Sequence, residues 1–160
     1  MIKTVVFRAA LLSAAFLCAS TGASAAGKLR FVRPNVIPEP VRLDYAEDVL
    51  CRLDDNASVR VVCGDKAAAK WVEEKADDFL GVEPKVLWVA RNGAPLGEGA
   101  YRLKAEGGNS FTLEADGLAG VRNAFYTLRM ALMAERGVLK SKAWICPQLN
   151  VEDAPRHAFR

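Results

Sequence analysis

The sequence has very little of the residue types on which most enzymes depend. Its 160 residues contain one histidine, His157, which lies close to the end of the sequence. A catalytic nucleophile needs a base held by an orienting partner, and a structural zinc ion needs four cysteine or histidine ligands. Gly93, Gly97 and Gly99 lie between expected strands rather than ahead of a helix, so they do not form a phosphate loop. We therefore predict no catalytic residue, no metal site and no cofactor.

A strong charge of either sign is also missing. The 22 lysines and arginines nearly balance the 19 aspartates and glutamates, and no basic stripe with interleaved aromatics indicates a nucleic-acid partner. Paired carboxylates would be needed for glycosidase chemistry. The pairs at 73–74 and 77–78 fall on the polar side of an expected helix, and the pair at 54–55 falls in an expected turn. Trp71 and Trp88 are expected to pack in the core rather than to stack on sugars.

No apolar run is long enough to cross a membrane as a helix. The run at 9–19 follows two basic residues and is shorter than the ~20 residues that a bilayer requires. The small residues at 23–25 match the pattern that signal peptidase recognises, so residues 1–25 are predicted to be a signal peptide. Cys18 would suggest a lipoprotein anchor, but Leu17 is larger than such a motif accepts. We expect export to the periplasm or the extracellular space, with no membrane partner after cleavage.

Three cysteines remain after that cleavage, Cys51, Cys63 and Cys146. An odd count excludes a complete disulfide framework. Cys51 and Cys63 lie in neighbouring apolar segments, so they form a possible disulfide if those segments are adjacent strands in an oxidising compartment. Buried free thiols are the favoured alternative, because cysteine is among the most buried residue types.

The hydrophobic pattern of the first half predicts strands and one helix. Strands are expected at 41–43, 59–63 and 86–90, the first of them at a sheet edge. Apolar residues keep helical spacing over 65–81, between an aspartate suited to cap the helix and a glycine suited to end it. Strand, helix and strand within such a short stretch indicate a right-handed βαβ crossover.

The second half predicts a hairpin, a second helix and a final strand region. The hairpin strands are expected at 101–105 and 111–115, joined by a glycine turn. The apolar stripe of 121–132 predicts the helix, which is expected to end at Gly137. One or two strands are expected between residues 144 and 151. The predicted fold class is α+β, a mixed β-sheet with two α-helices packed on one face.

Three stretches, in this order, resemble the N-terminal domain of the glycoside hydrolase family 20 β-N-acetylhexosaminidases. The first is the proline-bracketed segment at 37–40. The second is the block at 101–132, with its hairpin and a helix that carries Thr-Leu-Arg at 127–129. The third, at 151–160, is similar to the linker that leads into the family's catalytic barrel.

This resemblance implies a domain organisation and a function. Residues 26–35 would be a tether, residues 36–150 the non-catalytic domain with its zincin-like layered fold, and residues 151–160 a linker toward a catalytic barrel that is expected to be absent. In this family the substrate's acetamido group attacks the anomeric carbon, and an adjacent Asp-Glu pair orients it and acts as acid and base. That pair has no counterpart here. By resemblance only Arg160 matches a substrate-binding residue, and its role would require the barrel.

The expected function is therefore that of a non-catalytic domain of a secreted β-N-acetylhexosaminidase. Its partner would be the barrel, which would remove terminal N-acetylhexosamine from glycans, and the chain alone is expected to be inactive. The chain is also expected to expose an apolar patch that would otherwise pack on the barrel. Two alternatives stay open: a standalone secreted module that binds glycans or proteins, and the similar N-terminal domain of another retaining glycosidase family.

Overall fold

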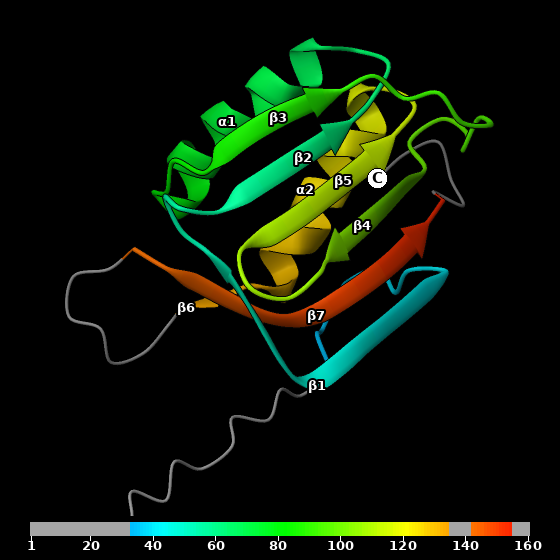
Figure 1. Cartoon of the computed structure of the whole chain (residues 1–160). Helices are drawn as coiled ribbons and strands as arrows, with labels where there is room; N and C mark the ends of the chain where they lie inside the picture. The colour runs from blue at the N-terminus through cyan, green and yellow to red at the C-terminus, as the bar shows by residue number, and fades with distance from the viewer. Residues whose placement is uncertain (1–32, 135–141, 155–160) are drawn as a thin grey trace, which may run out of the picture.

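A mixed β-sheet with both helices on one of its faces organises the molecule (Figure 1). The computed structural model describes residues 33–134 and 142–154. The strand order is β1-β7-β4-β5-β2-β3, and the short β6 pairs with β7. The α+β prediction is confirmed. The elements are β1 (Arg42–Leu53), β2 (Ser58–Val62), α1 (Ala67–Leu80), β3 (Lys85–Val89), β4 (Tyr101–Ala105), β5 (Ser110–Ala115), α2 (Leu118–Ala131), β6 (Met133–Ala134) and β7 (Trp144–Asp153).

The predicted crossover unit is formed by β2, α1 and β3. β2 runs parallel to β3, and α1 provides the crossover that this pairing requires. β2 also pairs parallel with β5. The Asp65 side chain accepts a hydrogen bond from the Ala67 N–H at 2.8 Å, but the N-cap position of α1 is Lys66, so Asp65 lies one residue ahead of the cap that was predicted for it. Gly81 ends the helix in the left-handed region, at φ 63°.

The predicted hairpin is formed by β4 and β5, with Tyr101 opposite Ala115. At its turn Gly107 and Gly108 have φ values of 78° and 60°, which glycine adopts without steric cost. β7 pairs with the other side of β4, so the hairpin lies in the middle of the sheet. No helix among the described residues is long and apolar enough to span a membrane.

The last third of the chain differs from the expected boundaries. α2 ends at Ala131, not at Gly137, because the chain becomes extended at Leu132 and pairs with β7 through β6. β7 is a single strand that continues through Asp153. The first three residues of the predicted linker at 151–160 therefore belong to the sheet.

β1 is much longer than the strand expected at 41–43. It lies at one edge of the sheet and pairs antiparallel with β7, with a register shift between Ala46 and Leu50. Residues 47–49 bulge out between the pairs Ala46–Gln148 and Leu50–Pro147, and Pro147 has no N–H to donate to the ladder. The bulge breaks the alternation of apolar and polar residues, and it is this alternation that marks a strand in a sequence.

The core lies between the sheet and the helices. Tyr101 is buried there, and its hydroxyl hydrogen-bonds the Thr127 hydroxyl at 2.5 Å, so both polar groups are satisfied. Gly120 allows α2 to approach the sheet closely. The two helices bury one side each, and the buried positions are Ala68, Val72, Ala76 and Leu80 in α1 and Gly120, Val121, Ala124, Phe125, Thr127, Leu128 and Ala131 in α2.

Candidate domain-docking surface

Four aromatic rings lie in contact with one another between the two helices. The Trp71 ring of α1 meets Phe125 and Tyr126 of α2 edge to face, with centroid distances of 5.6 and 6.1 Å. The ring of Phe79, further along α1, lies 6.4 Å from that of Tyr126. Aromatic pairs at such distances and angles add to the stability given by area burial alone. The rings therefore hold α1 against α2.

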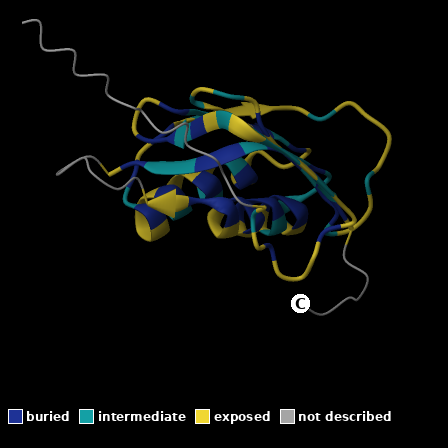
Figure 2. Cartoon of the chain, turned by 90° about the horizontal axis from the view of Figure 1, so that it is seen from below, coloured by how far each residue is buried: buried dark blue, intermediate teal, exposed yellow. Residues whose placement is uncertain are grey.

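This ring cluster passes from the core to the surface. Phe125 is 2% exposed, whereas Phe79, Tyr126 and Met130 are 39%, 40% and 41% exposed. Tyr126 and Met130 are four residues apart, so they lie on one line along α2. Figure 2 shows exposed residues along the side of both helices that faces away from the sheet. We call Phe79, Tyr126 and Met130 the helix patch.

Cationic side chains surround the apolar rings. The Lys75 ammonium lies 5.4 Å from the Phe79 ring centroid, and the Arg129 guanidinium lies 4.8 Å from it. The Arg122 guanidinium lies 5.4 Å from the ring of Trp71. Each contact of this kind contributes about 0.5–1 kcal/mol at an exposed site. Lys75 is also paired with Asp78 at 2.6 Å, so Arg122 and Arg129 are the basic groups beside the patch. Such a surface fits a partner that has an apolar centre and acidic groups around it.

The opposite face of the sheet carries ion pairs over β4, β5 and β7, and the exposed apolar residues Leu87 and Val89 of this face lie on the edge strand β3. Glu114 alternates along β5 with buried residues, so its side chain lies on the face away from the helices. Arg91 is only 7% exposed at its side chain and forms ion pairs with Glu114 at 3.0 Å and with Asp116 at 2.6 Å. Asp116 also accepts backbone hydrogen bonds from Gly97 and Leu96, which with the nearby Arg91 hold its pKa below the usual value. These groups anchor the loop that follows β3.

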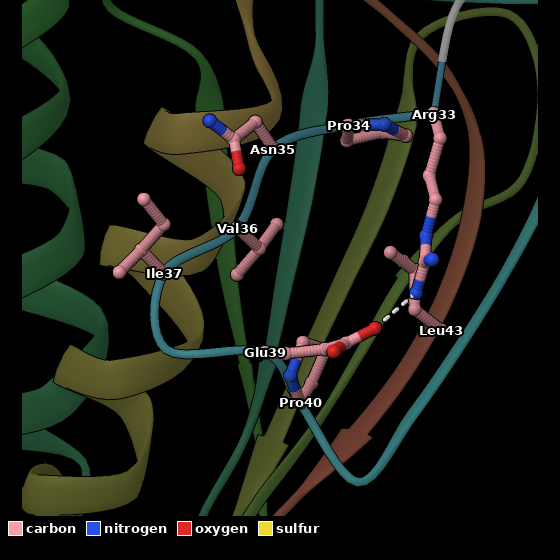
Figure 3. A pocket seen from close by; sticks show the side chains of 8 residues that line it. All are labelled: Arg33, Pro34, Asn35, Val36, Ile37, Glu39, Pro40 and Leu43. Carbon is pink, nitrogen blue, oxygen red and sulfur yellow. Dashed lines mark hydrogen bonds and ion pairs between the residues drawn. The ribbon is translucent and has the colours of Figure 1, made fainter.

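A hollow lies where the chain enters β1 (Figure 3). The side chains of Arg33 and Glu39 form an ion pair with each other at its rim. The other residues that line it are aliphatic apart from Asn35. The hollow offers neither an aromatic ring nor a pair of carboxylates, so we assign no glycan site to it.

The model of "Glycosyl hydrolase family 20, domain 2" matches residues 33–154. The chain belongs to this family. Its described residues are those of domain 2, the non-catalytic domain found in β-N-acetylhexosaminidases. The match decides against another retaining glycosidase family as the origin of the domain.

Solved structures show the same fold within longer chains. A glycoside hydrolase family 20 β-N-acetylglucosaminidase is 31% identical, with a TM-score of 0.53, over 79% of this chain and 24% of its own. The Streptomyces plicatus N-acetyl-β-hexosaminidase is 27% identical, with a TM-score of 0.59, over 83% of this chain and 29% of its own. The Vibrio harveyi exo-β-N-acetylglucosaminidase is 23% identical, with a TM-score of 0.61, and is covered over 21% of its length. No curated protein matches the chain.

The residues predicted to form sites are not brought together in domain 2. Arg160 lies outside the described residues. Cys51 lies in β1 and Cys63 just after β2, with β7, β4 and β5 between those strands. The condition for a Cys51–Cys63 disulfide, adjacent strands, is therefore not met, and the three described cysteines are buried free thiols. The residue opposite Cys51 is Cys146 of β7.

The paired carboxylates lie where they were predicted, one pair in a turn and two on the polar side of α1. Asp54 accepts a hydrogen bond from the Asn56 N–H at 2.9 Å, and Asp55 accepts one from the Glu83 N–H at 2.8 Å. The two helical pairs are exposed on α1. Within the described ranges no group of three or more histidines, cysteines or carboxylates is placed to hold a metal ion.

Two features of domain 2 escaped the sequence analysis. Trp88 was expected in the core, but β3 is an edge strand, and Trp88 is 38% exposed with its indole N–H bonded to the Cys63 carbonyl at 3.0 Å. The helix patch was not recognised either. Tyr126 and Met130 fall outside the buried stripe of α2 and are four residues apart, and this spacing is a signal that could have identified them.

Proposed function

We propose that domain 2 of this chain supports the catalytic barrel of a secreted β-N-acetylhexosaminidase, which removes terminal N-acetylhexosamine from glycans. The family match over residues 33–154 carries the proposal. The two relatives above 25% identity bear the names β-N-acetylglucosaminidase and N-acetyl-β-hexosaminidase. Asp54 is engaged in a turn, and Glu114 and Asp116 in ion pairs, which favours a structural role for these carboxylates over a catalytic one.

The helix patch is the surface on which the barrel would dock. Over β4, β5 and β7 the other face of the sheet is lined by internally paired charges, whose burial would cost solvation energy. The cores of protein interfaces are enriched in aromatic residues, methionine and arginine. Tyr126 and Met130 supply the apolar centre of such an interface, and Arg122 and Arg129 lie beside it.

The first test compares the purified chain with the product of the complete coding frame. We expect the chain to release no nitrophenol from nitrophenyl N-acetylglucosaminide above the rate in buffer. We expect the frame beyond the Arg160 codon to encode a barrel with an adjacent Asp-Glu pair, and its complete product to hydrolyse the substrate.

Two results would contradict the proposal. Clear turnover by the pure chain would overturn the non-catalytic role. A frame without that barrel would remove the proposed partner. Binding of chitooligosaccharides or murein fragments by the chain would then favour the standalone module, and no binding up to ~1 mM, about −4 kcal/mol, would count against it.

Export forms part of the same proposal and has a separate test. Residues 1–25 combine a basic start, a short apolar run and a small-residue cleavage pattern. When the full chain is expressed in bacteria, we expect a periplasmic protein whose first residue is Ala26, as read by N-terminal sequencing. A cytoplasmic protein that keeps its first residues, or one lipidated at Cys18, would contradict this prediction.

A further inference from the structure

Cys51 and Cys146 lie directly opposite each other in the antiparallel pair of β1 and β7. Directly opposed residues in such a pair have Cα atoms about 4.5–5.5 Å apart, and their side chains point to the same face. Disulfides span Cα distances of about 4.4–6.8 Å. The register therefore places the two residues at a separation that a disulfide bridges, and both side chains are fully buried.

The two sulfur atoms also differ in acidity. The Gly107 N–H donates a hydrogen bond to the Cys51 sulfur at 3.1 Å. The hydrogen bond from Cys146, aided by that from Gly107, lowers the pKa of Cys51 to about 7 against the opposing effect of burial. The hydrogen bond to Cys51 and burial raise the pKa of Cys146. Cys51 is thus the sulfur that carries thiolate character near neutral pH, and the thiolate is the reactive form.

We propose that Cys51 and Cys146 are an oxidation site, at which a small disulfide compound converts the two thiols into a cross-strand disulfide. The Cys51 thiolate attacks one sulfur of the oxidant, which forms a mixed disulfide and releases one thiolate of the oxidant. Cys146 gives its proton to that thiolate and attacks the Cys51 sulfur, which releases the second thiolate of the oxidant. This thiolate takes up from solvent the proton that Cys51 had lost. Two electrons pass to the oxidant, and the two protein protons end on its two thiols.

The position of β1 explains how buried sulfurs meet the oxidant. β1 is an edge strand, and its ladder with β7 is interrupted at 47–49, next to Cys51. On its other side the backbone of this part of β1 is bonded to the turn residue Gly108, through the Arg52 N–H and the Leu50 carbonyl. Local opening of such an edge requires less free energy than global unfolding. The exchange takes place while β1 is open or before it docks during folding.

Cys63 is excluded from the bridge by its position. Its sulfur accepts a hydrogen bond from the Asp65 N–H at 3.4 Å and lies 3.8 Å from the Asp116 carbonyl oxygen. Three strands separate β2, which Cys63 follows, from β1. This third thiol therefore serves as an internal reference in the experiment.

The test uses the chain without its predicted signal peptide, residues 26–160, purified under reducing conditions. The protein is equilibrated with oxidised glutathione at a denaturant concentration below the unfolding midpoint. After denaturation and alkylation, mass spectrometry is expected to find only Cys63 alkylated, and peptide mapping to find Cys51 linked to Cys146. Because the bridge closes a loop on the order of 100 residues, the oxidised protein should melt roughly 10 °C above the reduced protein.

Matched variants separate the bridge from other effects. Cys63→Ser should keep the linked peptide and the shift in melting temperature, whereas Cys51→Ser and Cys146→Ser should lose both. Alkylation of all three cysteines after equilibration would overturn the proposal, as would a link that includes Cys63. Neither readout depends on export or on a catalytic barrel, so failure here leaves the proposed function unaffected.

Discussion

Gly120→Ala is expected to lower the free energy of unfolding by about 3 kcal/mol, the upper range for overpacking. A Cβ at Gly120 would lie 2.4 Å from the carbonyl oxygen of Ala100 and 2.7 Å from the Cβ of Ala115. Both neighbours are fixed to the backbone of the sheet, so no side-chain rotation relieves the clash. The variant must move α2 away from β4 and β5 and loosen the core between them.

Gly117→Ala is the matched control, because it adds the same methyl group three residues earlier. No atom lies within 4 Å of a Cβ at Gly117, and its φ of −146° is extended backbone. We expect a change within ~1 kcal/mol, since the only cost is that alanine is a poorer N-cap residue than glycine. Urea denaturation with a common slope measures both variants. Equal stabilities would show that α2 does not approach the sheet as closely as described.

The helices were predictable because their signals are local. Asp65 and Gly81 mark the ends of α1, and its buried positions recur every four residues. The hairpin of β4 and β5 was predictable for the same reason, since a glycine turn joins two alternating segments. Such features depend on residues that are close in the sequence, which a single sequence displays directly.

The edges of the sheet were not predictable in the same way. β1 pairs with β7, the last strand, and β3 lies at the opposite edge with Trp88 exposed. No local pattern states which strands become neighbours, so the pairing of Cys51 with Cys146 was missed and a bridge to Cys63 was considered instead. Trp88 was predicted in the core because its strand is rich in apolar residues. This pattern does not distinguish an edge strand from a central one.

The existence of an apolar docking surface was predicted, but its position on the domain was not. The family resemblance implied an exposed apolar patch, yet its residues follow from the contact between the two helices. Phe79 is one of the apolar residues with helical spacing in the segment 65–81, next to the buried Leu80, and it is 39% exposed. The aromatic contact of Phe79 with Tyr126 depends on how α1 packs against α2, which no single helical pattern contains.

Phe125 and Tyr126, adjacent in α2, are expected to separate folding from docking. Phe125→Ala should lower the free energy of unfolding by about 3–5 kcal/mol, because it removes a buried ring that packs against Trp71 at 5.6 Å. Tyr126→Ala should cost less than ~1 kcal/mol in the domain alone, because its ring is 40% exposed. Urea denaturation of the mature chain measures both values.

Tyr126→Ala, the variant with the smaller effect on stability, is expected to have the larger effect on association with the proposed barrel. Tyr126→Ala should weaken binding of the separately produced barrel at least ~10-fold, about 1.4 kcal/mol, because an aromatic side chain at the centre of an interface is where truncation costs most. Thr112→Ala, on the polar face of the sheet, is the control and should bind as the wild type does. If Tyr126→Ala also binds with unchanged affinity, the helix patch is not the docking surface. Reduced binding by Tyr126→Ala with unchanged domain stability would separate the contact with the barrel from the packing of α1 on α2.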